Sequence, residues 1–355
     1  MRILQTGLTY KDDAKATPGF TLYSPLWTKK TYLMNMDGEP VHEWDLPGTP
    51  GGYARLLPNG NLFYAAQWDG DDVPPFKGGA QGGIMREVDW DGNVLTEFID
   101  GWQHHDARKL ANGNIVYAGW EVMPEDAQKR VQGGRPGTEP PGGIFGDYVR
   151  EVDPDGNTVW EWHTYEMDVE KYPIHPLVAR RVFAWCNTTF PLDNGDVLIS
   201  LRQINTIAII DRQTNKFRWE FTDMILGGQH DPQLLPNGNV IVFANGMNSY
   251  EGHPHSLILE IDPKSNEIVW QYRAQPRTDF YSHHISGQER LWTGNTLICE
   301  GRNGRLFEVT PDGELAWEFI SPHRGPGIDG DNVNWVFRAF RYAEDSPEIA
   351  GRVKL

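Results

Sequence analysis

Three histidines occupy the same position of a repeated sequence unit, which makes them the residues best placed to do chemistry together. His230 lies in GGQHDPQLLPNGNVIVFANG, His105 in HHDARKLANGNIVYAGW and His284 in SHHISGQERLWTGNTLICEG. Neutral imidazoles bind divalent metals, and a bound metal activates water or polarises a carbonyl. The sequence therefore allows one metal site of three histidines, to which His104 or His283 could also contribute.

Each of these units is typical of a β-hairpin. A polar opening leads into an apolar strand, a tight turn (Asn-Gly in most copies) reverses the chain, and a second strand returns. Two further copies, WCNTTFPLDNGDVLISLR and GGYARLLPNGNLFYAAQ, carry Asn187 and glycine in place of histidine. A second kind of hairpin, with a D-G-type turn and a tryptophan-rich strand, begins at Thr31, Met85, Tyr148, Ile207, Leu257 and Leu306.

One hairpin of each kind makes a four-stranded antiparallel meander, and a series of such repeats predicts an all-β, six-bladed β-propeller. The first repeat starts with a late-blade hairpin at 31–44, preceded by a strand-like segment at 19–25, and the last ends with an early-blade strand at 333–342. We expect the N- and C-terminal segments to pair in one blade and close the ring. Residues 1–355 are expected to form one propeller domain, with 1–18 as an N-terminal extension.

This connectivity places every tight turn on one face and every long connection on the other, where function usually lies. Segments 121–146 and 163–184 are the expected lids over the channel. Asp106 and Asp231 follow two of the histidines, and we expect them to cap backbone N–H groups or orient a ring. The residues expected around the channel mouth are Gly52, His105, Asn187, His230, His284 and Asn334 from the innermost strands, and Gln67, Trp120, Arg202, Asn245 and Arg302 from the second strands.

Composition limits the partners. The formal net charge of -17 argues against nucleic acid or an anionic membrane, since both are polyanions that attract basic surfaces. The two cysteines, Cys186 and Cys299, form neither a disulfide framework nor a metal-binding spacing. No signal peptide or membrane-spanning run is visible, so we expect a cytoplasmic protein, or a periplasmic one if a leader has been removed. The sequence does not predict an oligomeric state.

The run from WCNTTFPLDNGDVLISLR through IIDRQTNKFRWEF to GGQHDPQLLPNGNVIVFANG resembles the PAPS-independent bacterial arylsulfotransferase family, and the blade periodicity extends this resemblance over most of the chain. In that family a six-bladed propeller transfers a sulfuryl group between phenols by a ping-pong reaction through a sulfated histidine, without a cofactor. The resemblance implies that His230 is the nucleophile. His105, Asn187 and Arg202 match other motif residues of the family.

Under this resemblance neutral His230 would attack sulfur in line and hold the sulfuryl group covalently. Arg202 and Asn187 would bind the sulfuryl oxygens as charge develops, and His105 could protonate the departing phenolate. The substrate would be a small aromatic or anionic molecule. The residues expected to contact it are Trp185, Trp120, Arg302, Asn334 and Tyr281.

The sequence departs from the family pattern in places that suggest alternatives. Trp185 stands where the family has a histidine, and His283 and His284 match no family motif. A metal-dependent lyase or hydrolase would use His105, His230 and His284 as ligands of one divalent metal, and a metal-bound His230 could not also be the nucleophile. A non-catalytic ligand-binding propeller is the third possibility.

Overall fold

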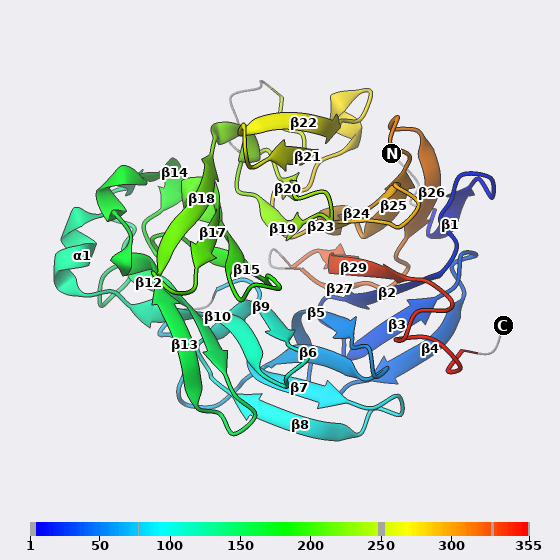
Figure 1. Ribbon diagram of the computed structural model, residues 1–355, viewed down its shortest axis with the longest axis horizontal. Coiled ribbons are helices and arrows are strands. Elements are labelled where there is room, and N and C mark those ends of the chain that lie inside the picture. The colour runs from blue at the N-terminus through cyan, green and yellow to red at the C-terminus, as the bar shows by residue number, and fades with distance from the viewer. Residues whose placement is uncertain (1–4, 77, 248–252, 328–329, 354–355) are drawn as a thin grey trace.

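The computed structural model describes residues 5–76, 78–247, 253–327 and 330–353. In these residues the strands form six large antiparallel sheets, set around a ring with one edge strand of each sheet at the centre (Figure 1). The prediction of an all-β, six-bladed propeller is confirmed. Among the described residues no helix is long and apolar enough to cross a membrane.

Four of the blades follow one another along the chain, each built as two hairpins. From the centre outward, the first has β5 (Pro50–Leu56), β6 (Leu62–Gln67), β7 (Gly83–Val88) and β8 (Val94–Ile99). The second has β9 (Gln103–Lys109), β10 (Ile115–Val122), β12 (Phe145–Val152) and β13 (Thr158–His163). The third has β15 (Cys186–Pro191), β16 (Val197–Leu201), β17 (Thr206–Asp211) and β18 (Lys216–Thr222). The fourth has β19 (His230–Leu234), β20 (Val240–Ala244), β21 (Leu257–Asp262) and β22 (Glu267–Tyr272).

The two ends of the chain close the ring, as the sequence predicts. The closing blade consists of β29 (Val336–Tyr342), β2 (Phe20–Pro25), β3 (Lys30–Met34) and β4 (Pro40–Asp45). Its innermost strand comes from the C-terminal part of the chain, and Phe20 of β2 lies opposite Tyr342 of β29. Pairing of this kind leaves no open strand edge between the first and last blades.

Part of residues 1–18, which we expected to form an N-terminal extension, joins a blade as an added strand. The remaining blade has β23 (Gly287–Arg290), β24 (Thr296–Glu300), β25 (Arg305–Val309), β26 (Leu315–Ile320) and a fifth, outermost strand, β1 (Gly7–Lys11). β1 pairs with the outer edge of β26, and Thr9 Oγ1 donates to the Glu318 carboxylate at 2.7 Å. An added strand of this kind covers an otherwise unpaired edge.

The blades are joined by a repeated tryptophan contact, which accounts for the tryptophan-rich outer strands. The indole N–H groups of Trp160 and Trp219 donate to the side-chain oxygens of Asn215 and Asn266, each in the turn of the next blade. Corresponding bonds to backbone carbonyls run from Trp44 to Asp89, from Trp270 to Pro311 and from Trp317 to Met36. These tryptophans thus pack between neighbouring blades.

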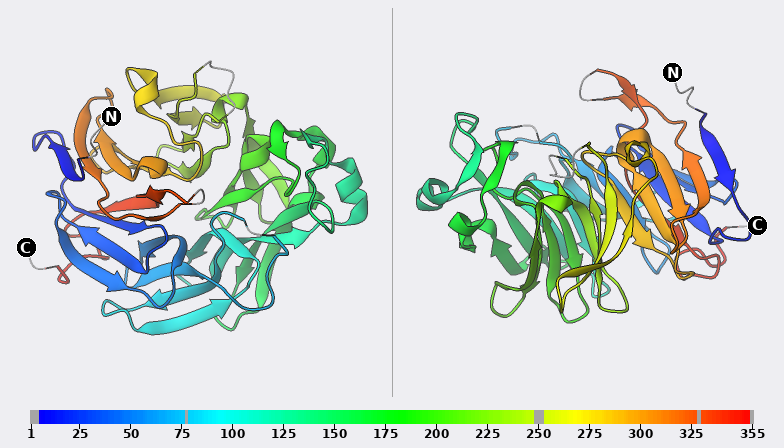
Figure 2. Two further views of the ribbon diagram at one scale, coloured as in Figure 1. Left: turned by 180° about the vertical axis from the view of Figure 1, so that it is seen from behind. Right: turned by 90° about the horizontal axis from the view of Figure 1, so that it is seen from above.

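The long connections lie on the face opposite the tight turns, as the right view of Figure 2 shows. The segments predicted as lids, 121–146 and 163–184, pair with each other through β11 (Gly133–Arg135) and β14 (Ile174–Ala179). They also contain α1 (Glu125–Arg130), which buries Ala127 between Met123 and Val131 in the core of the second and third blades. Apolar residues four apart in this segment are a helical signal.

The remaining short elements lie in the connections. They are β27 (Gly325–Pro326), β28 (Asn332–Val333) and the 3₁₀ turns Thr164–Glu166, Val169–Lys171, Arg202–Ile204, Met224–Leu226, Arg277–Asp279 and Gly301–Asn303.

Candidate functional site

His105 lies near the inner end of the second blade, in a backbone bulge. Its φ is +56°, and the pairing of β9 with β10 shifts register between Tyr117 and Ala118. Bulges at the rim of a closed sheet redirect side chains. The backbone N–H of His105 donates to the Ala80 carbonyl at 2.7 Å, which ties β9 to the connection between β6 and β7.

Both ring nitrogens of His105 have partners, and these fix its tautomer. The Trp185 indole N–H, which can only donate, lies 3.2 Å from His105 Nε2. Burial, with contributions from His104 and Arg202, holds the pKa of His105 well below its usual range, so the ring is neutral and its proton is on Nδ1. That proton faces His104 Nδ1 at 2.8 Å. His104 then carries its proton on Nε2, which is 3.2 Å from the Asp147 carboxylate.

His230 is the first residue of β19, and it is also fixed as one tautomer. Its Nδ1 lies 2.7 Å from Asn245 Oδ1. The Asn245 amide nitrogen donates to the carbonyls of Ser282 and Ile285, at 2.6 and 3.0 Å, so the amide oxygen must face the histidine. His230 Nδ1 is therefore protonated and Nε2 carries the lone pair. Burial and then the charge of Arg202 hold the pKa of His230 well below its usual range, which keeps the ring neutral.

Arg202 opens the 3₁₀ turn after β16, and in the described residues no carboxylate pairs with its guanidinium. Burial lowers the pKa of Arg202 to about 10, and Nη2 lies 3.7 Å from Met247 Sδ. After burial, the charge of Arg202 is among the contributions that lower the pKa of His105, His230 and His284, so the guanidinium lies near all three rings. Arg202 is partly buried, and a cation in such a place without a counter-ion favours the binding of an anion.

A buried ion network packs behind the histidines. Arg338 of β29 lies 3.3 Å from the carboxylates of both Asp106 and Asp231, and Arg108 lies 3.3 Å from Asp106. Burial works to raise the pKa of Asp106, but Arg108, Arg338 and the Tyr53 hydroxyl outweigh it and lower the pKa to about 2. Asp106 also accepts a backbone N–H bond at 2.8 Å. The prediction that these aspartates have a structural role agrees with this geometry.

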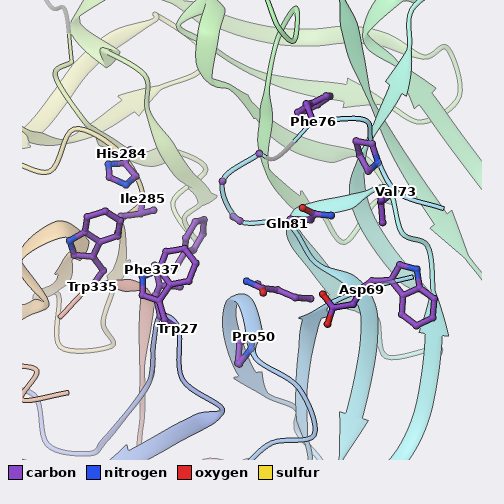
Figure 3. A pocket seen from close by; sticks show the side chains of 18 of the residues that line it. Trp27, Pro50, Asp69, Val73, Phe76, Gln81, His284, Ile285, Trp335 and Phe337 are labelled. Atoms are coloured by element: carbon purple, nitrogen blue, oxygen red, sulfur yellow. The ribbon is translucent and has the colours of Figure 1, made fainter. Parts of the chain in front are cut away.

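A cavity of about 870 Å³ opens beside the histidines (Figure 3). Trp27, Trp335, Phe337 and His284 stand on one side of it and Phe76 on the other. The remaining lining residues are Leu26, Pro50, Gly51, Gln67, Trp68, Asp69, Gly70, Val73, Pro74, Pro75, Gly78, Gly79, Ala80, Gln81 and Ile285. The connection between β6 and β7, rather than the segments expected as lids, forms much of the wall.

Phe337 links this cavity to the histidines. Its ring centroid is 6.1 Å from that of His105 and 6.2 Å from that of His230. Both histidines are largely buried, with exposed fractions of 9% and 2%. The cavity is thus lined largely with aromatic and apolar groups, and Phe337 stands between it and the rings of His105 and His230.

The other predicted site residues are placed as follows. Asn187 Nδ2 donates to the Gln229 carbonyl at 2.8 Å and so holds the segment that leads into His230. Trp120 is fully buried and stacks on His104, with ring centroids 4.1 Å apart, and Gly78 lies directly over its indole. A Cβ on Gly78 would come within 2.2 Å of that ring, so Trp120 is covered on the cavity side.

The remaining candidates lie around His284. Arg302 stacks on Trp335, its guanidinium carbon 4.3 Å from the ring centroid. Tyr281 lies 6.1 Å from His283, and His283 lies 4.5 Å from His284, between ring centroids. Asn334, placed in the sequence at a strand start, precedes β29, and its amide donates to the carbonyls of Asn303 and Ser321 at 3.1 Å.

The histidines do not fit a three-histidine metal site. Across the described segments, no three His, Cys, Asp or Glu side chains are grouped to hold a metal ion. His105 has its ring nitrogens on Trp185 and His104, and His230 Nδ1 is bound to Asn245. The geometry leaves His105 without a lone pair for a metal.

Sequence reasoning did not identify Asp147, Phe337 or Arg338 as neighbours of the site. Arg338 and Phe337 come from the closing strand, and Asp147 from β12, three strands into its blade from the centre. Asp147 stands in the run FGDYV at the start of β12, where it is the only charged residue among five buried positions. An acid within such an apolar run is the signal that could have revealed it, because buried carboxylates need partners.

Solved structures with similar folds include proteins of different kinds. A protein of unknown function from Bacteroides caccae is 14% identical, with a TM-score of 0.56 and coverage of 92% of this chain and 100% of its own. Virginiamycin B lyase from Staphylococcus aureus is 12% identical (TM-score 0.43, coverage 76% and 69%). The periplasmic gluconolactonase PpgL from Pseudomonas aeruginosa is 11% identical (TM-score 0.49, coverage 90% and 97%). At such identities a likeness concerns the fold alone.

No curated protein matches the sequence. The family model described as Arylsulfotransferase (ASST) matches residues 85–322, which is more than half of the 355 residues. The matched region includes the histidines, Asn245 and Arg202 described above. The chain therefore belongs to the arylsulfotransferase (ASST) family.

Proposed function

We propose that this protein transfers a sulfuryl group from an aryl sulfate to a phenol through a covalent intermediate on His230. The observation that carries this proposal is the fixed tautomer of His230. Asn245, itself held by two backbone carbonyls, binds Nδ1–H and leaves the Nε2 lone pair available. A neutral imidazole in this state is a nucleophile at every pH near neutrality.

The transfer takes place in two steps. First, His230 Nε2 forms a bond to sulfur, the bond between sulfur and the aryl oxygen breaks, and its electron pair leaves with the phenolate. Second, the oxygen of an acceptor phenol attacks the same sulfur, and the electron pair of the N–S bond returns to Nε2. The leaving oxygen gains a proton in the first step and the attacking oxygen loses one in the second.

Arg202 and His105 support these steps. The guanidinium of Arg202, without a carboxylate partner in the described residues, stabilises the sulfuryl oxygens as negative charge redistributes. His105 exchanges the proton with the substrate oxygen. The aryl group occupies the cavity among Trp27, Trp335 and Phe337, where stacking and apolar contact favour a planar ring.

The test is sulfuryl transfer from 4-nitrophenyl sulfate to phenol by the wild type and His230→Ala. We expect the alanine variant to lose transfer, since no other side chain would supply the nucleophile. His175→Ala is the matched control, because His175 lies in β14, away from the cavity, and it should transfer normally. Transfer by His230→Ala at the wild-type rate would overturn the proposal.

A further inference from the structure

We propose that Asp147 and His104 form a buried proton store that supplies His105 and recovers its proton. The inference rests on the proposed function, because the proton is exchanged with the substrate oxygen in the two half-reactions. Neither Asp147 nor His104 touches the substrate, and both act through His105.

The geometry is a continuous line of polar atoms leading away from the site. His104 Nδ1 faces His105 Nδ1 at 2.8 Å, and His104 Nε2 lies 3.2 Å from an Asp147 carboxylate oxygen. Among the described residues, neither His104 Nε2 nor either Asp147 oxygen makes a hydrogen bond in this state, so these buried atoms face each other with no hydrogen-bonded partner. His104 and Asp147 are 0% exposed. Trp120 stacks on one face of the His104 ring, and Thr164 Oγ1 accepts the backbone N–H of Asp147 at 2.9 Å. The His104 ring and the backbone of Asp147 are therefore held in place, and both side chains are shielded from water.

In its resting tautomer His105 cannot act as an acid, and the line through His104 to Asp147 supplies the missing proton. His105 Nε2 accepts the Trp185 N–H, so in this state it has no proton to give to a phenolate. With one more proton in the line, Asp147 is a neutral carboxylic acid, His104 carries its proton on Nδ1, and His105 carries its proton on Nε2. Every group is then uncharged, the Trp185 N–H has lost its acceptor on His105, and His105 Nε2–H can donate to the substrate oxygen.

The two half-reactions interconvert these states. In the first, His105 Nε2–H gives its proton to the departing phenolate, His104 passes its Nδ1 proton to His105 Nδ1, and Asp147 passes its proton to His104 Nε2. In the second, the acceptor phenol gives its proton to His105 Nε2, and the same shifts run in reverse to Asp147. In each cycle the line gives one proton to the departing phenolate and takes one from the acceptor phenol.

The burial of these groups supports Asp147 as the place where the proton rests. Burial lowers the pKa of His104 to about 3, and it raises the pKa of Asp147 to about 7 against the N–H groups of Cys186 and Trp185. Neither histidine can hold a positive charge near neutral pH, whereas Asp147 can bind or release a proton there. Asp147 also acts on a neighbouring carboxyl group. Burial raises the pKa of Glu121, and the charge of Asp147 contributes to this rise.

The experiment compares two donors in a single turnover, following release of the phenol. Departure of 4-nitrophenolate needs little help from a proton, whereas unsubstituted phenolate from phenyl sulfate needs a general acid. Asp147→Asn keeps the shape and an acceptor for His104 but cannot store the proton. We expect release from phenyl sulfate to fall by about 10²-fold or more, with a much smaller loss for 4-nitrophenyl sulfate.

Two further variants keep the test decisive. His104→Phe retains an aromatic ring against Trp120 but removes both nitrogens, so it should show the same dependence on the donor, even if Asp147→Asn folds poorly. Asp155→Asn, in the exposed turn after β12, is the matched control and should behave as the wild type with both donors.

The possible results separate this inference from the proposed function. A general structural defect would lower release from both donors equally, and this result in both variants would overturn the proton store. Unchanged release from phenyl sulfate would overturn it as well, while leaving the proposed function intact. Absence of transfer by the wild type from either donor would overturn both.

Discussion

At the scale of single residues, the site depends on which charges are paired. Arg108 and Arg338 are matched with Asp106 and Asp231 in the buried network. Arg202 has no such partner in the described residues, and burial lowers its pKa to about 10. It therefore remains a cation, and its unmatched charge is available to the anionic group of a substrate.

We predict that Arg202→Met loses activity without losing stability. Removal of one preorganised donor to developing oxyanion charge costs about 10²–10³-fold in rate. Because the native guanidinium is partly buried without a carboxylate partner among the described residues, its loss should leave the free energy of unfolding unchanged or higher. Transfer kinetics and urea unfolding measure the two effects.

The control for Arg202→Met is Arg218→Met. Arg218 lies on the outer strand β18, is half-exposed and pairs with Asp196. This variant should retain full transfer activity. Rates for Arg202→Met within a few-fold of the wild type would show that the guanidinium does not stabilise the transferred group.

The repeat and the family resemblance predicted that His105, His230 and Arg202 lie close together. The tautomers were not predictable, because they depend on Asn245 and Trp185, whose roles follow from backbone carbonyls and a bulge rather than from residue type. Nor was Asp147 predictable as a partner of His104, since the pairing β9–β10–β12 alone brings them together.

At the scale of elements, the closing strand β29 contributes most to the centre of the ring. It supplies Phe337, which contacts His105 and His230, and Arg338, which is fully buried. Arg338 Nη2 also donates to Thr188 Oγ1 at 2.8 Å. One strand from the end of the chain thus bonds to β9, β15 and β19.

We predict that Arg338→Met lowers the free energy of unfolding by about 3 kcal/mol or more, because it leaves the buried carboxylates of Asp106 and Asp231 without one of their cations. Equilibrium unfolding in urea measures this. Arg324→Met, at an exposed position, is the control and should stay within about 0.5 kcal/mol of the wild type. Equal stability of the two variants would contradict a role for Arg338 in holding the blades together.

Among the elements, hairpins were predicted from their turns, because Asn-Gly and Asp-Gly pairs accept positive φ. Gly238, for example, has φ of +86° in the turn between β19 and β20. The partners of the long connections were not predictable. Segments 121–146 and 163–184 pack on each other through β11 and β14, which depends on contacts between distant parts of the chain.

At the scale of the whole molecule, the ring follows from the repetition itself. Each blade presents a tryptophan or another aromatic residue to its neighbour, and N- and C-terminal segments share one blade. The added strand β1 was not foreseen, since nothing in GLTYK differs from an exposed extension until the edge of β26 is available. The ring holds the histidines of β9 and β19, with Arg202 from between them in sequence, around one small volume beside the cavity.

The most direct measurement of the central claim is mass spectrometry of the protein after brief mixing with an aryl sulfate and no acceptor. The account predicts one sulfuryl group per chain, located on His230, absent from His230→Ala, and removed when a phenol is added. Transfer to a phenol without any such covalent species, or a sulfuryl group on another residue, would contradict it.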